Sequence, residues 1–162
     1  MPDLQIGAHT SGVYPAYSST SINAESGAIP GLGDRYEDNN GNRWVFISAS
    51  TSVTSYQVVA VTSDFRGQPA TSALASAAAY VGVAQNNISA GSYGWVQTRG
   101  NMSVNALSTC STAVALYTSG TAGSVDDTST SQVKIAPLVI NANITAAATT
   151  GAFAATDMFV AL

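Results

Sequence analysis

Apolar and polar positions alternate along several short segments of the chain, with the period of two that is typical of β-strands. Residues 43–49 are the clearest case, because Trp44 and Phe46 alternate there with further apolar residues, so that both faces are apolar. A strand of this kind is expected to be covered on both sides. Residues 55–63 repeat the alternation and predict the next strand.

Residues 80–84 and 92–98 predict a β-hairpin in the middle of the chain, joined by a polar loop that ends in glycine. Trp95 is expected to be the packing anchor of this hairpin, and the glycines that flank the second strand serve its turns. The alanine-rich residues 70–79 predict a loop or one to two helical turns, because they offer almost no large apolar side chain.

The second half of the chain continues with short strands, predicted over residues 102–107, 111–118, 133–141 and 157–162. Pro137 marks its strand as an edge or a bulge, since proline cannot donate to a ladder, and residues 146–156 are expected to be a loop. About eight short strands separated by turn residues predict an all-β fold. We expect a single antiparallel β-sandwich or barrel over residues 34–162, for which a jelly-roll-like arrangement is one possibility.

The first 33 residues lack this periodicity and carry isolated apolar side chains among serine, threonine, glycine and proline. We interpret residues 1–33 as an extended N-terminal arm that lies over another surface; a merely flexible terminus is the alternative. The residues expected to make the contacts of this arm with another surface or a neighbouring subunit are Leu4, Ile6, Val13, Tyr14 and Tyr17.

Charge is scarce, and this narrows the function. Only 9% of the residues are charged, 46% are apolar, and the formal net charge is −4. A surface of small uncharged groups is suited to extensive contact with other proteins, so a role in an assembly is favoured. The five basic residues are scattered, so nucleic-acid binding is not expected. The sequence shows neither a signal peptide nor an apolar run of about 20 residues, so we expect no membrane partner.

No catalytic constellation is evident, and the chain is predicted not to be an enzyme and to use no cofactor or metal. His9 is the one histidine and lies in the arm, no serine occupies a Gly-x-Ser-x-Gly turn, and there is no Cys-x-x-Cys pair. Cys110 is the one cysteine and is expected to be a small buried apolar residue.

Three polar or aromatic groups leave an alternative open. Residues 34–42 predict a hairpin turn at Asn40-Gly41, although their oxygen-rich side chains could also bind a cation. Asp126-Asp127 is interpreted as a turn cap, with a cation site as its alternative. The aromatic residues are expected to pack in the core, or else to stack on a sugar: Trp44, Tyr93 and Trp95.

Residues 41–47, the segments 80–84 and 90–97, and the ending at 159–162 resemble, in their order, the head decoration (cement) proteins of tailed bacteriophages. The resemblance covers about residues 31–162. It implies a small β-rich protein without cofactors, usually a homotrimer, that binds the major capsid protein on the virion surface and clamps neighbouring capsid subunits. Such a protein is made in the host cytoplasm. The alternative is a tail-fibre or glycan-binding, receptor-binding module, which shares the composition.

Overall fold

The computed structural model describes residues 17–18 and 30–161. In this part of the chain almost all regular structure is β, with one short helix, α2 (Ser72–Ser76). The strands are β1 (Tyr17–Ser18), β2 (Arg35–Glu37), β3 (Arg43–Ala49), β4 (Val58–Val61), β5 (Arg66–Pro69), β6 (Tyr80–Ala84), β7 (Ser92–Ala106), β8 (Leu116–Thr118), β9 (Val125–Asp126), β10 (Lys134–Ala136), β11 (Val139–Ile140), β12 (Ala148–Ala154) and β13 (Phe159–Ala161). The predicted all-β class is therefore confirmed.

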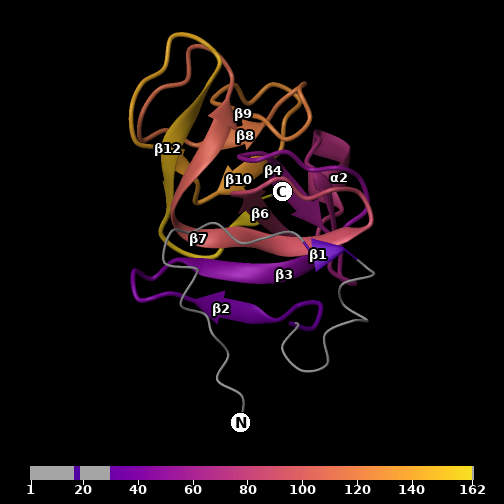
Figure 1. Ribbon diagram of the computed structural model, residues 1–162. Coiled ribbons are helices and arrows are strands. Elements are labelled where there is room, and N and C mark those ends of the chain that lie inside the picture. Colours follow the sequence, from indigo (N-terminus) through magenta and orange to yellow (C-terminus); the bar gives the residue numbers. More distant parts are fainter. Residues whose placement is uncertain (1–16, 19–29, 162) are drawn as a thin grey trace.

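Five strands close into a barrel in the order β7-β6-β4-β5-β3, with β3 returning to pair with β7. Most neighbours in this barrel are antiparallel, but β3 and β5 run parallel, so the barrel is mixed rather than wholly antiparallel. The strand β2 adds to the outer edge of β3, beside which it lies in Figure 1.

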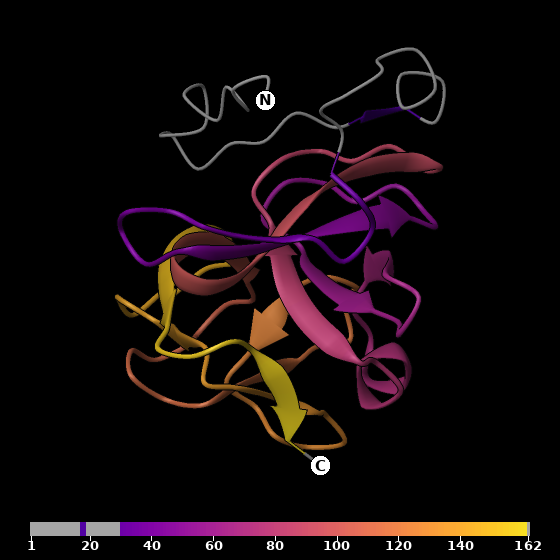
Figure 2. The same ribbon diagram turned by 90° about the horizontal axis from the view of Figure 1, so that it is seen from below.

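The long strand β7 belongs to two sheets. Its first half pairs with β3, and its second half pairs with the whole of β12, from Gly100 opposite Ala154 to Ala106 opposite Ala148. In Figure 1 β7 runs beside β3 and then turns upward beside β12. The second sheet continues from β7 through β9, β8 and β10 to β13, which Figure 2 shows in yellow on the opposite side of the molecule from β1.

Two hydrophobic clusters result, and β4 contributes to both. Val58 and Ala60 pack between the barrel and the second sheet, in what we call the inter-sheet cluster. Val59 and Val61 point the other way, into the barrel cluster. The inter-sheet cluster also contains Leu116, Ile135, Leu138 and Ile140, whereas the barrel cluster also contains Val45, Ile47, Ile88 and Val96. Burial on both faces explains why β4 is a continuous apolar run.

The predicted central hairpin is confirmed, because β6 and β7 pair antiparallel with Val83 opposite Gln97. The alanine-rich segment forms α2, whose N-terminus is capped when the Thr71 side chain accepts a hydrogen bond from the Leu74 amide. The predicted interruption at Pro137 is also found, since β10 ends and β11 begins around it.

Two segments in the second half of the chain differ from the prediction. Residues 146–156, expected to be a loop, contain β12, a strand of small residues that is formed by its seven-residue pairing with β7. The strand expected over residues 111–118 is shorter, because Ala113 has a positive φ of 58° and only β8 is extended. No helix in the part of the chain that the structure describes has the length and apolarity to cross a membrane.

Candidate functional site

Four of the five arm residues proposed as contacts, Leu4, Ile6, Val13 and Tyr14, lie outside the described residues. Tyr17 is described as part of β1, and it pairs antiparallel with Tyr93 at the start of β7. The strand β6 pairs with β7 only further along, at Val96 and Gln97. β1 therefore adds to β7 by backbone pairing, the mode by which an extended segment docks on a sheet edge.

The aromatic rings of this region form a cluster on the outside of the barrel. Phe46 stacks on Tyr93 with ring centroids 6.2 Å apart and lies 5.2 Å from the centroid of Trp95, which in turn meets Tyr36 edge-on at 6.4 Å. Trp95 is half-buried rather than central to the core, because its neighbour Val96 takes the inward position. The predicted packing role of Trp95 is thus found on the outer face of the barrel.

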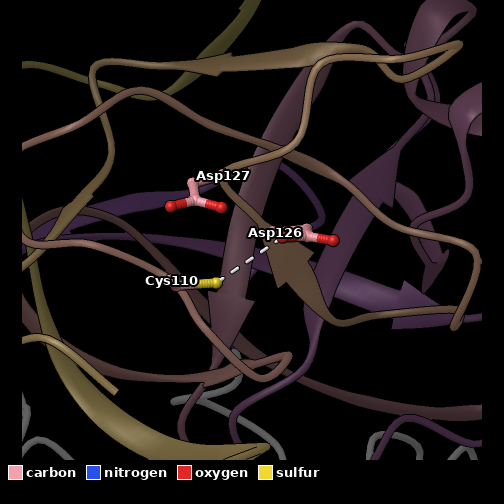
Figure 3. A group of neighbouring side chains, drawn as sticks. All are labelled: Cys110, Asp126 and Asp127. Carbon is pink, nitrogen blue, oxygen red and sulfur yellow. Dashed lines mark hydrogen bonds between the residues drawn. The ribbon is translucent and has the colours of Figure 1, made fainter. Parts of the chain in front are cut away.

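Three potential metal ligands meet in the described part of the chain. The sulfur of Cys110 and carboxylate oxygens of Asp126 and Asp127 all lie within 4.8 Å of one another. Figure 3 shows the three side chains grouped together. The thiol is 3.7 Å from Asp126 Oδ1, to which it can donate. Asp126 accepts from the Thr128 amide two residues further on, at 3.3 Å, and so caps a turn as predicted. Asp127 instead accepts from the Ser111 amide at 2.9 Å and links two segments that are sixteen residues apart.

Burial is the main reason why the pKa of the Cys110 thiol is raised above its usual value, and the two neighbouring carboxylates raise it further. At neutral pH the sulfur therefore stays protonated, and a protonated thiol is a poor metal ligand. The expectation that Cys110 behaves as a buried apolar residue agrees with its place in the inter-sheet cluster.

This raised pKa predicts a loss of stability at high pH. The unfolded chain releases the thiol proton near pH 8.5 and the folded chain only at higher pH, so the free energy of unfolding should fall in between, by at most about 1.4 kcal/mol per pH unit. Urea unfolding gives the free energy of unfolding of the wild type and of Cys110→Ala from pH 7 to 9.5. The difference between the two free energies should be constant near neutral pH. Above pH 8.5 it should change in favour of the variant, because only the wild type loses this stability. Parallel profiles would contradict the assignment.

The candidate cation loop is a five-residue hairpin loop between β2 and β3, rather than the predicted two-residue turn. Its carboxylate is used by the loop itself. Asp38 Oδ1 accepts from the amides of Asn40 and Asn42, both at 2.9 Å, and Oδ2 accepts from Asn42 Nδ2 at 2.8 Å. Asp34 likewise accepts from the Gly31 amide at 2.8 Å. These contacts favour the turn interpretation.

Two further carboxylates are neutralised by arginine. Arg43 Nη1 lies 2.7 Å from Asp157 Oδ2, and its Nη2 lies 2.8 Å from Glu37 Oε2. Asp157 also accepts from the Thr98 hydroxyl at 3.0 Å. This network ties the segment before β13 to β3 and β7, and it gives both carboxylates a structural task.

A polar pocket of about 480 Å³ lies beside the point where β7 passes from one sheet to the other. Six of its thirteen lining residues carry a side-chain amide, and the single charged one is Asp38. The lining is formed by Asp38, Asn40, Asn42, Trp44, Tyr56, Gln85, Gln97, Asn101, Met102, Ser103, Asn141, Gly151 and Ala152.

Several of these amides are fixed by the fold. Gln85 donates to the Ser103 carbonyl at 3.0 Å and accepts from the Ser103 amide at 3.1 Å. Asn42 accepts from the Asn101 amide at 3.0 Å while it donates to Asp38. The pocket was not predicted, because its residues come from six separate stretches of the chain. Of the aromatic residues considered for sugar stacking, the buried Trp44 lines it, whereas Tyr93 and Trp95 pack on Phe46.

No known protein family matches the chain, and neither does any curated protein sequence. Among solved structures, the fold is similar to that of the N-terminal base of the head fibre protein gp8.5 of bacteriophage phi29, with a TM-score of 0.51. The similarity covers 70% of this chain and 94% of the fibre base, at 17% sequence identity. It is therefore a similarity of fold that spans nearly all of the fibre base.

Proposed function

We propose that this chain is a structural protein of a bacteriophage virion, a decoration or cement protein that binds the outer surface of the head and stabilises contacts between major capsid subunits. The observation that carries the proposal is the similarity of its fold to the base of a phage head fibre. The charge-poor composition supports it, because 9% charged residues leave a surface suited to broad protein contact.

The mechanism is burial, and it needs neither catalysis nor a cofactor. The arm residues Leu4, Ile6, Val13, Tyr14 and Tyr17 are proposed to bury their side chains along the capsid surface, at the cost of ordering the segment. The backbone pairing of β1 with β7 supports this, since it tethers the arm to the barrel at Tyr17. A homotrimer would present three arms at once, and the effective concentration of the second and third would multiply a modest contact.

Copy number separates this proposal from a fibre or receptor-binding module. A cement protein occupies every equivalent capsid position, so quantitative mass spectrometry of purified virions should find hundreds of copies. A few copies per virion would instead favour a fibre or receptor-binding module. If the protein is absent from virions, both hypotheses are wrong.

Deleting residues 1–16 is expected to weaken binding to capsids that lack the protein at least tenfold, which is about 1.4 kcal/mol, while β1 and the barrel remain. Co-sedimentation with purified capsids measures the effect. A full-length variant with Leu4→Ser, Ile6→Ser, Val13→Ser and Tyr14→Ser should reproduce it, because the length is kept and the apolar anchors are lost. The matched control replaces polar arm residues instead, with Thr10→Ala, Ser11→Ala, Ser19→Ala and Thr20→Ala. If the protein without residues 1–16 binds capsids as tightly as the wild type, the arm does not contribute to capsid binding and this part of the proposal is wrong.

A further inference from the structure

The polar pocket beside β7 has the size and the preformed lining of a small-ligand site. Its volume of about 480 Å³ falls inside the range of roughly 300–1,000 Å³ that such sites occupy. Its rim is held in place by hydrogen bonds within the protein, through Gln85 to Ser103 and through Asn42 to Asn101. A rim that is already ordered loses little freedom when a ligand binds.

Gln97 presents a hydrogen-bond acceptor from deep in the wall. Its side chain is 1% exposed, and its Nε2 donates to the carbonyls of Arg99 at 2.9 Å and Asn101 at 2.8 Å. These two bonds fix the amide plane, and Gln97 Oε1 accepts no hydrogen bond from the residues that the structure describes. Gln97 Oε1 is not among the buried atoms that lack a partner, so it is open to the pocket, where a ligand hydroxyl can donate to it in place of water.

Three further amide residues at the pocket are exposed, and within the described part of the chain their side chains are left to hydrogen-bond with solvent. The side chains of Asn40, Asn101 and Asn141 line the pocket, and none of the three makes a hydrogen bond to the described part of the chain. Each offers both a donor and an acceptor. A ligand that matches them must itself carry several groups that donate and accept, as adjacent hydroxyl groups do.

The same pocket has an apolar side. Tyr56, Met102 and the buried Trp44 contribute to its lining. Tyr56 is held with a positive φ of 68°, its amide donating to the Ala84 carbonyl at 2.6 Å and its carbonyl accepting from the Asn105 amide at 2.8 Å. Such a backbone is uncommon for a bulky residue and persists where the surroundings enforce it. An aromatic ring beside amides is suited to a ligand with one apolar face and polar edges.

Charge restricts the ligand further. Among residues 17–18 and 30–161, no lysine, arginine or histidine lines the pocket, so an anionic ligand would meet no counter-charge from this part of the chain. The one carboxylate, of Asp38, is occupied by Asn40 and Asn42. Hydrolysis of a glycosidic bond usually requires two carboxylates across the site, and the lining offers one. We infer that this pocket binds a short neutral saccharide, without cleaving it.

This inference does not rest on the capsid proposal and is tested on the purified full-length chain. Saturation-transfer NMR and calorimetry are run with maltose, lactose and N,N′-diacetylchitobiose, and with 3′-sialyllactose as the anionic counterpart of lactose. We expect at least one neutral disaccharide to bind with a dissociation constant on the order of 1 mM or below, intact after prolonged incubation, and sialyllactose to bind at least tenfold more weakly than the neutral ligand.

A blocking variant places the ligand in the pocket. At Gly151 a Cβ atom would meet only the Asn141 Nδ2, at 3.4 Å, so Gly151→Val should fill the pocket without disturbing the core and should weaken binding more than tenfold. Gly120→Val is the matched control, because a Cβ there meets nothing within 4 Å and Gly120 is outside the lining. If Gly151→Val fails to fold, the double variant Asn101→Ala/Asn141→Ala is used instead, and it should also weaken saccharide binding more than tenfold.

Three results would each overturn the inference. These are a failure of all the neutral disaccharides to bind, an equal affinity for sialyllactose, and an unchanged affinity in a folded Gly151→Val protein.

Discussion

Replacing Gly100 with alanine is expected to lower the free energy of unfolding by about 2–5 kcal/mol. Gly100 has a φ of +96° at the point where β7 leaves the barrel for the second sheet, a backbone conformation that costs an alanine about 1–2 kcal/mol. Its added Cβ would also lie 2.9 Å from the Cα of Asn42 and still closer to the oxygen of the Asn42 side chain. Overpacking of this kind costs typically a further 1–3 kcal/mol.

The clash also has a consequence for hydrogen bonding. Asn42 Oδ1 accepts from the Asn101 amide at 3.0 Å, and this bond would be lost when the side chain of Asn42 moves away. Gly91→Ala is the matched control, because Gly91 has a similar φ of +75° but its Cβ would meet nothing within 4 Å. Gly91→Ala should therefore cost about 1–2 kcal/mol. Urea unfolding of both variants measures the difference, and equal losses would show that close packing at Gly100 has no energetic weight.

The strands with bulky alternating residues could be predicted from the sequence, because their side chains serve two packed surfaces at once. β3, β4, β6 and the first half of β7 are of this kind, and the β6–β7 hairpin was predicted with them. β12 was missed because its small residues carry little periodic signal. Its extended form depends on the pairing of Gly100–Ala106 with Ala148–Ala154, a contact between distant segments.

The polar pocket could not be predicted for a related reason. Asn and Gln are common on any solvated surface, and the lining joins residues as far apart as Asp38 and Ala152. One local signal existed, because Gln97 lies in the predicted strand over residues 92–98, two residues after Trp95, which was expected to be the packing anchor. Its burial to 1% exposure singles it out only once the neighbouring carbonyls of Arg99 and Asn101 are known. Polar pockets of this kind are formed by topology rather than by a motif.

Residues 34–162 are predicted to unfold as one unit. A truncation in either hydrophobic cluster is therefore expected to lower the free energy of unfolding of the whole unit. Leu116 in the inter-sheet cluster and Ile47 in the barrel cluster are both 0% exposed. Truncation of either to alanine is expected to cost about 2–5 kcal/mol, from lost burial and the cavity left behind. Because β4 and β6 place residues in both clusters, a loss on one side should destabilise the other equally. Val114→Ala is the control, since Val114 is 38% exposed and should change stability by less than about 0.5 kcal/mol.

Two probes report on the two clusters separately. The tryptophans, Trp44 and Trp95, both lie on barrel strands, so their fluorescence follows the barrel. Cys110 lies in the inter-sheet cluster, so the reaction of its thiol with Ellman's reagent follows the second sheet. Cooperative unfolding requires the two denaturation curves to coincide in the wild type, in Leu116→Ala and in Ile47→Ala. The contrary result is a Cys110 thiol in the Leu116→Ala variant that reacts at urea concentrations where the tryptophan fluorescence is still native. The two sheets would then unfold as independent units, and the single-domain prediction would be wrong.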